Sequence, residues 1–121
     1  MLKEVAMPEL VDLKMLELIE KFEEDINQIQ ETRSAKVFKA ANVDLQNIYN
    51  YHLLNDKAFK KIQLNLKNLY TAFNYAAIIV NDAIKKRSMD KENVELLDQC
   101  LEVMLRCCMV IEDTLKRKKK K

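Results

Sequence analysis

Apolar residues recur along most of this 121-residue chain at alternating steps of three and four, the spacing that puts them on one side of a helix. The first such run lies on residues 8–31 and comprises Met15, Ile19, Phe22, Ile26 and Ile29. Pro8 suits the first helical turn, where its missing N–H would have no partner. The pattern therefore predicts a helix over 8–31 with one buried side.

A second run predicts a helix over residues 35–54. Its apolar side carries Val37, Phe38, Ala41, Leu45, Ile48 and Tyr49. Ser34 can cap the start of this helix, because a serine hydroxyl accepts a hydrogen bond from the N–H groups of the first turn. No glycine or proline separates Thr32 from Ser34, so one continuous helix over 8–54 is the alternative. We expect a break here.

The third run has the most regular spacing in the chain and predicts one helix over residues 57–87. Its apolar positions are Phe59, Ile62, Leu66, Leu69, Phe73, Ala76, Val80 and Ala83. A single helix of this extent is about 45 Å long at 1.5 Å per residue. Asn55 and Asp56 mark the preceding turn, and Asp56 is the expected cap.

The fourth run predicts a helix over residues 91–116, with Asp90 as its N-cap. Its apolar seam comprises Val94, Leu97, Leu101, Met104, Cys108, Ile111 and Leu115. The middle of this helix, residues 103–111, is apolar nearly all round and is interrupted only by Arg106. A helix of that kind is buried on more than one side. We therefore expect a central helix or one that a second chain covers.

The fold class follows from these runs and from the absence of glycine, which hairpins and bulges commonly require. We predict an all-α chain with one domain over residues 1–115 and a basic tail over 116–121. The three-four spacing favours coiled-coil-like packing, and the short turns favour antiparallel neighbours. The predicted architecture is a three- or four-helix up-and-down antiparallel bundle, either complete by itself or completed by oligomerisation.

Composition argues against most catalytic chemistry. Without glycine there is no phosphate-binding loop or dinucleotide fingerprint, and with one histidine there are no paired Glu-x-x-His motifs for a di-iron site. No Cys-x-x-Cys pair occurs. We expect no enzyme activity, catalytic residue, metal, cofactor or small-molecule substrate. His52 is expected to be a partly buried or rim histidine.

Three cysteines, Cys100, Cys107 and Cys108, form a poor disulfide framework and are expected to be small apolar fillers. The chain start lacks the features of a secretory signal, and no apolar stretch approaches the roughly 18 residues of a membrane span. The expectation is an intracellular protein of a reducing compartment, cytoplasmic or nuclear, with no membrane span.

The favoured functional hypothesis is a non-enzymatic protein–protein interaction module, such as an adaptor, scaffold or assembly subunit. The 91–116 helix carries a second apolar stripe beside its seam, and that stripe is surplus to a small core. The predicted partner-binding residues are Leu96, Val103, Leu105, Cys107, Met109 and Val110. The partner is a helix of another protein or a second copy of this chain, bound in a groove or by bundle completion.

Charge is unevenly distributed along the chain, although the net charge is only +2. Residues 1–33 and 92–115 each carry −5, whereas residues 57–91 carry +6 and the tail 116–121 a further +6. The basic segment either pairs with the acidic helices within the molecule or faces outward to an anionic partner. The residues of such an outward face are Lys57, Lys60, Lys61, Lys67, Lys85, Lys86 and Arg87, joined by Lys116, Arg117, Lys118 and Lys119 of the tail.

That outward face supports the alternative function, a nucleic-acid-binding accessory protein. Basic side chains release counterions from phosphates, which makes such binding strongly dependent on salt. The tail alone has other interpretations as well, namely a nuclear-import signal, a contact for anionic lipid, or a solvated helix end.

Overall fold

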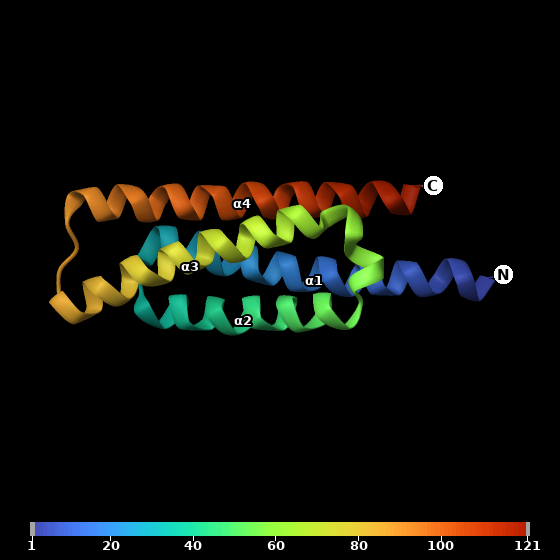
Figure 1. Ribbon diagram of the computed structural model, residues 1–121, viewed down its shortest axis with the longest axis horizontal. Coiled ribbons are helices and arrows are strands. Elements are labelled where there is room, and N and C mark those ends of the chain that lie inside the picture. The colour runs from blue at the N-terminus through green and yellow to red at the C-terminus, as the bar shows by residue number, and fades with distance from the viewer. Residues whose placement is uncertain (1, 121) are drawn as a thin grey trace.

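The computed structural model describes residues 2–120, with side chains described over 10–116. The described chain contains four α-helices, which are α1 (Leu2–Thr32), α2 (Ala35–Leu54), α3 (Gln63–Lys86) and α4 (Lys91–Lys120). A 3-10 segment, η1 (Asp56–Ile62), joins α2 to α3. Consecutive helices run in opposite directions along one long axis (Figure 1). The all-helical prediction is confirmed, and the helices make extensive contacts with one another.

The core lies between the four helices and is built from the predicted seams. Close backbone packing joins α3 to α4, α1 to α2, and α1 to α4. Aromatic rings link α2 to α3, since Phe38 stacks on Phe73 with ring centroids 4.8 Å apart and Tyr49 meets Tyr70 edge-on at 5.3 Å. Phe22 of α1 lies against the same Phe73 ring at 5.9 Å. Large side chains thus bridge α2 and α3 across the core.

The break after Thr32 forms as expected, and arginine rather than glycine makes both sharp helix ends. Arg33 follows α1 with φ of 55°, and Arg87 follows α3 with φ of 57°. The N–H of Ser88 donates to the carbonyl of Ala83 at 3.2 Å, which closes the last turn of α3. Left-handed geometry costs a residue with a Cβ about 1–2 kcal/mol, so both turns carry backbone strain. At the second helix start, Ser34 Oγ accepts from the N–H of Val37, as predicted.

The predicted start of the first helix at Pro8 is wrong, because α1 already begins at Leu2. Proline removes the hydrogen bond that its N–H would have donated to the carbonyl of Glu4, and its ring also crowds that carbonyl. The residues ahead of it are mostly good helix formers, which lets the helix extend past that one missing bond.

The prediction of one straight helix over 57–87 is also wrong. The backbone leaves α-helical geometry at Phe59 (φ −112°, ψ 22°) and Ile62 (φ −107°, ψ 7°), and α3 begins only at Gln63. Figure 1 shows the resulting elbow, η1, crossing one end of the molecule. A bend here turns Phe59 and Ile62 into the core, where both are essentially fully buried. We call this the elbow end, and the end with the turns after α1 and α3 the turn end.

Candidate docking groove between α3 and α4

A groove with a volume of about 640 Å³ runs between α3 and α4. Its walls are mainly apolar, and we call it the docking groove. The lining residues are Asn68, Thr71, Ala72, Tyr75, Ile78 and Ile79 of α3 and Leu96, Gln99, Cys100, Val103 and Cys107 of α4. Steps of three, four and seven place each set on one side of its helix, beside the seam that faces the core.

Four large apolar side chains of this groove remain substantially exposed. The exposed fractions are 63% for Tyr75, 67% for Ile78, 44% for Leu96 and 43% for Val103. Single exposed apolar residues are ordinary, but a contiguous apolar patch marks an interaction site. The groove is therefore a surface of the described chain that fits an apolar partner.

The structure divides the six predicted partner-binding residues. Leu96, Val103 and Cys107 line the groove, but Cys107 is buried at 7% exposure and forms its floor. Leu105 is half-buried and packs against the core instead, because it lies next to the α4 seam. Met109 and Val110 are exposed farther along α4, beside a separate hollow near Lys116.

The α3 wall of the groove was missed by the sequence analysis. Tyr75 and Ile78 are apolar residues that lie off the three-four seam of α3, and that was the available signal. Spacing assigns them to an outward position, but it cannot show that α4 adds Leu96 and Val103 beside them.

The cysteines behave as apolar fillers. All three are free thiols, with Cys100 half-buried and Cys107 and Cys108 buried. Burial raises the pKa of each thiol, and the carboxylates of Glu23 and Glu112 raise the pKa of Cys108 further. These thiols are therefore protonated and weakly nucleophilic at neutral pH.

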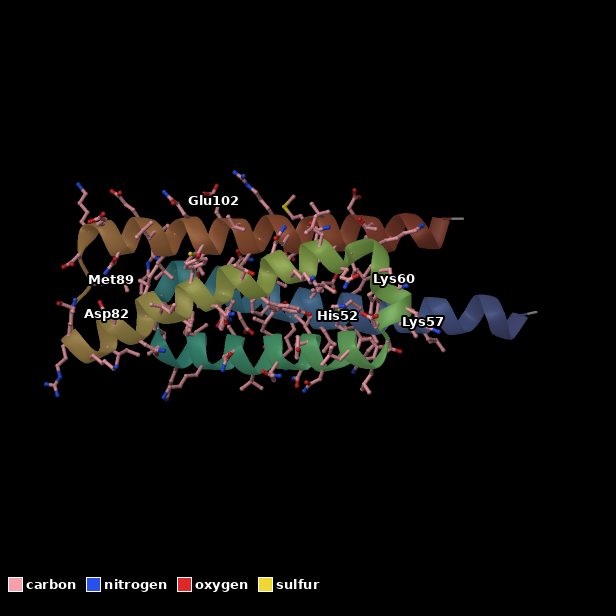
Figure 2. All side chains as sticks on the ribbon, viewed as in Figure 1. His52, Lys57, Lys60, Asp82, Met89 and Glu102 are labelled. Carbon is pink, nitrogen blue, oxygen red and sulfur yellow. The ribbon has the colours of Figure 1, made fainter. Side chains whose placement is uncertain are left out.

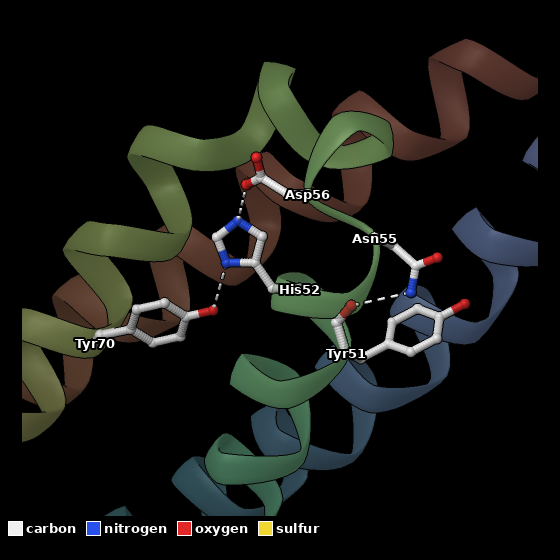
Figure 3. A network of polar contacts seen from close by, with 5 residues as sticks. All are labelled: Tyr51, His52, Asn55, Asp56 and Tyr70. Atoms are coloured by element: carbon white, nitrogen blue, oxygen red, sulfur yellow. Dashed lines mark hydrogen bonds and ion pairs between the residues drawn. The ribbon is translucent and has the colours of Figure 1, made fainter.

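The single histidine is more deeply buried than expected. His52 has 5% exposure, and its Nδ1 lies 3.2 Å from the Tyr70 hydroxyl while its Nε2 lies 3.6 Å from Asp56 Oδ1 (Figure 3). Burial lowers the His52 pKa, and nearby Asp56 opposes that shift. In the same network the Asn55 amide donates to the Tyr51 carbonyl at 3.0 Å. These contacts fasten α2, the elbow and α3 together, and Asp56 serves there rather than as the predicted helix cap.

Two pairs of carboxyl groups join α1 to its neighbours, and α1 supplies one member of each pair. Burial, followed by a hydrogen bond to Asp44 of α2, raises the Asp25 pKa to about 7, against the opposing effect of Lys21. Burial, followed by a hydrogen bond to Glu23, likewise raises the pKa of Glu112 to about 7. Each pair can form its hydrogen bond only when one member is protonated.

Six of the seven lysines and arginines predicted as one outward face are split between the two ends of the molecule, and Lys67 is exposed within α3. Lys57 and Lys60 lie at the elbow end, whereas Asp82 and Met89 lie at the opposite end (Figure 2). Lys85, Lys86 and Arg87 lie between Asp82 and Met89 in the sequence and therefore belong to that opposite end. The 24 residues of α3 separate the two groups by about 36 Å. The side chains of Arg117, Lys118 and Lys119 lie outside the described residues, and Lys116 is exposed.

Pairing of the basic segment with the acidic helices, the first of the two alternatives, is not seen among side chains 10–116. Ion pairs there join Lys21 to Asp44, Arg33 to Asp98, Lys86 to Asp82 and Arg106 to Glu102. None of these bonds joins a lysine of α3 to an acid of α1 or α4. Lys67 and Lys85 of α3 and Glu92 and Glu95 of α4 are exposed and take no part in these ion pairs.

No family model, curated protein or solved structure matches the chain. Within the described residues, no cluster of three or more His, Cys, Asp or Glu side chains is placed to hold a metal ion. None of the helices over 2–120 combines the length and apolar character needed to cross a membrane.

Proposed function

We propose that this chain is a non-enzymatic protein–protein interaction module, an up-and-down antiparallel bundle with coiled-coil-like packing that self-associates through the docking groove. The observation that carries the proposal is the joint exposure of Tyr75, Ile78, Leu96 and Val103 on one face. Burying such side chains contributes about 25 cal/mol for each Å² of apolar surface removed from water, and the loss of translational and rotational freedom on association offsets part of this gain.

A second copy of the chain fits this surface better than an arbitrary apolar helix because of charge. α3 holds three lysines and Asp82, a net charge of +2, and the segment 92–115 of α4 carries −5. A twofold axis parallel to the helices would place α4 of one copy over α3 of the other, so that opposite charges face each other. Such complementarity selects the partner and its register more than it adds affinity.

The spacing of apolar residues on α4 suits such a contact. Leu96, Val103 and Val110 follow one another at steps of seven, the repeat that keeps a stripe facing a neighbouring helix. Val103 lies at the centre of this stripe and inside the groove. A charge at that position would have to be buried on association, at a cost of several kcal/mol.

The test compares Val103→Glu with Val43→Glu, a matched change at an α2 valine that is 60% exposed and does not line the groove. Sedimentation equilibrium from a few to about 100 μM gives the mass, which is 14.3 kDa for one copy. We expect the unchanged chain and Val43→Glu to form dimers and Val103→Glu to remain monomeric. Circular dichroism should show the same helix content in all three.

Two results would count against this function. If the unchanged chain is a monomer at every concentration, the proposed self-association is wrong. Equal dimerisation of Val103→Glu and Val43→Glu would show that the interface lies outside the groove.

A nucleic-acid-binding role is the second proposal, and it now concerns the elbow end alone. Lys57, Lys60 and Lys61 are exposed there, and α4 ends on the same side with Lys116 exposed (Figure 1). Fluorescence anisotropy with generic duplex and single strands should show affinity falling steeply between 50 and 200 mM salt. Replacing the three elbow lysines with glutamate should abolish it, and no binding at low salt would end this proposal.

A further inference from the structure

The two ends of the helical domain are closed differently. At the elbow end, Phe59 and Ile62 fill the space between the helices. At the turn end, the described residues leave a pocket of about 360 Å³. We call this the end pocket. Its lining residues are Ile29, Arg33, Ser34, Ala35, Phe38, Val80, Ala83, Ile84, Ser88, Met89, Val94 and Leu97.

The lengths of the helices explain the pocket. α3 has 24 residues and α2 has 20, a difference that adds about 6 Å. Figure 1 shows α3 and α4 continuing past the turn between α1 and α2, with α3 diverging from α4 toward its end. The inner faces of α3 and α4 are therefore uncovered there. Ala35 and Ala83 contribute only methyl groups, which leaves the space unfilled.

The walls of this pocket are residues that the apolar spacing assigns to the core. Val80, Ala83 and Val94 belong to the predicted seams of their helices, yet each is only half-buried. Ile84 at the rim is 51% exposed. Buried side chains form the floor of the pocket, among them Phe38, whose ring stacks on Phe73. Apolar side chains around an unfilled space gain free energy when an apolar ligand displaces water from them.

One lining residue of the pocket carries a charge. Arg33 stands at the rim, held in place by its left-handed backbone, and its Nη1 lies 2.6 Å from Asp98 Oδ1. A guanidinium has five N–H donors, so this ion pair leaves donors for a second anion. Ser34 and Ser88 belong to the same lining.

We propose that the end pocket binds a small anionic amphiphile, with an alkyl or aryl body inside the pocket and a carboxylate or sulfonate head on Arg33. An apolar cavity of about 150 Å³ is enough to hold benzene. The volume here is more than twice that, which suits a medium-length alkyl chain or two fused rings. The pocket does not overlap the docking groove, so this inference is independent of self-association.

Binding is measured with anilinonaphthalene sulfonate, a fluorescent probe with an apolar naphthalene, an apolar phenyl ring and a sulfonate. Decanoate and decanol, below micelle-forming concentrations, then compete with the probe. We expect saturable fluorescence that decanoate displaces better than decanol. Arg33→Gln should weaken the binding of decanoate about tenfold, as expected for a lost charge-assisted hydrogen bond, and leave the binding of decanol unchanged.

Filling variants locate the site. Ala83→Leu and Ala35→Leu each place a larger side chain in the pocket, and Ala40→Leu is a matched change at an exposed α2 position outside it. The first two should reduce probe affinity at least tenfold, while Ala40→Leu leaves it unchanged. Ala35 lies at the exposed start of α2, so its variant folds even if Ala83→Leu does not.

The proposal is overturned if the unchanged chain gives no saturable signal, or if both filling variants bind as well as Ala40→Leu. It is also overturned if Val103→Glu abolishes the signal while the filling variants do not, because the probe would then occupy the docking groove. Equal displacement by decanoate and decanol would contradict the role of Arg33.

Discussion

Replacing Arg87 with glycine is expected to stabilise this glycine-free protein. Arg87 ends α3 in left-handed geometry, with φ of 57° and ψ of 26°. Its N–H donates to the Ile84 carbonyl at 3.3 Å, and this bond does not depend on the side chain. Glycine can therefore adopt the same turn, keep its hydrogen bonds and avoid the clash of the Cβ with the backbone.

Two opposing terms set the size of the effect. Relief of left-handed strain is worth about 1–2 kcal/mol. The greater freedom of glycine in the unfolded chain offsets about 0.5–1 kcal/mol of this gain in stability. The net gain in unfolding free energy is then about 0.5–1 kcal/mol. For 121 residues, 1 kcal/mol corresponds to a rise in Tm of about 4 °C.

Urea unfolding followed by circular dichroism measures the change, and Arg87→Ala is the control. Alanine removes the same guanidinium but keeps the Cβ, so the difference between the two variants isolates backbone strain. Lys67→Gly, at an exposed position inside α3, should instead destabilise the protein by about 1 kcal/mol. If Arg87→Gly were no more stable than Arg87→Ala, the argument from left-handed strain would be refuted.

Two further predictions concern the elbow and the carboxyl pairs. Phe59→Ala should lower the unfolding free energy by about 3–5 kcal/mol, because it empties a fully buried site, and a loss below 1 kcal/mol in urea unfolding would show that the elbow does not close the core. Asp25 and Glu112 bind protons more tightly when folded than when unfolded, so unfolding free energy should fall as pH rises from about 4 to 7. Both groups are partly solvated, which limits the change to about 1 kcal/mol each. Chemical unfolding across this pH range should show that decline, and Asp25→Asn with Glu112→Gln should flatten it.

Local spacing was sufficient for the helices themselves. A side chain three or four residues from another lies on the same side of a helix whatever the rest of the chain does. The seams of α1, α2 and α4, the Ser34 cap and the break after Thr32 depend only on near neighbours. The fold class was therefore predictable, and so was the exposure of Leu96 and Val103 beside the α4 seam.

Features made by two or more helices were not predictable in this way. Phe59 and Ile62 keep a helical spacing in the sequence even though the backbone bends at the elbow. Only their packing against the other helices shows that the chain bends there. The α3 wall of the docking groove and the end pocket depend on which faces meet and where each helix ends. Periodicity in a chain records which side of a helix is apolar. Tertiary packing decides which of those apolar sides are covered and which stay open to another molecule.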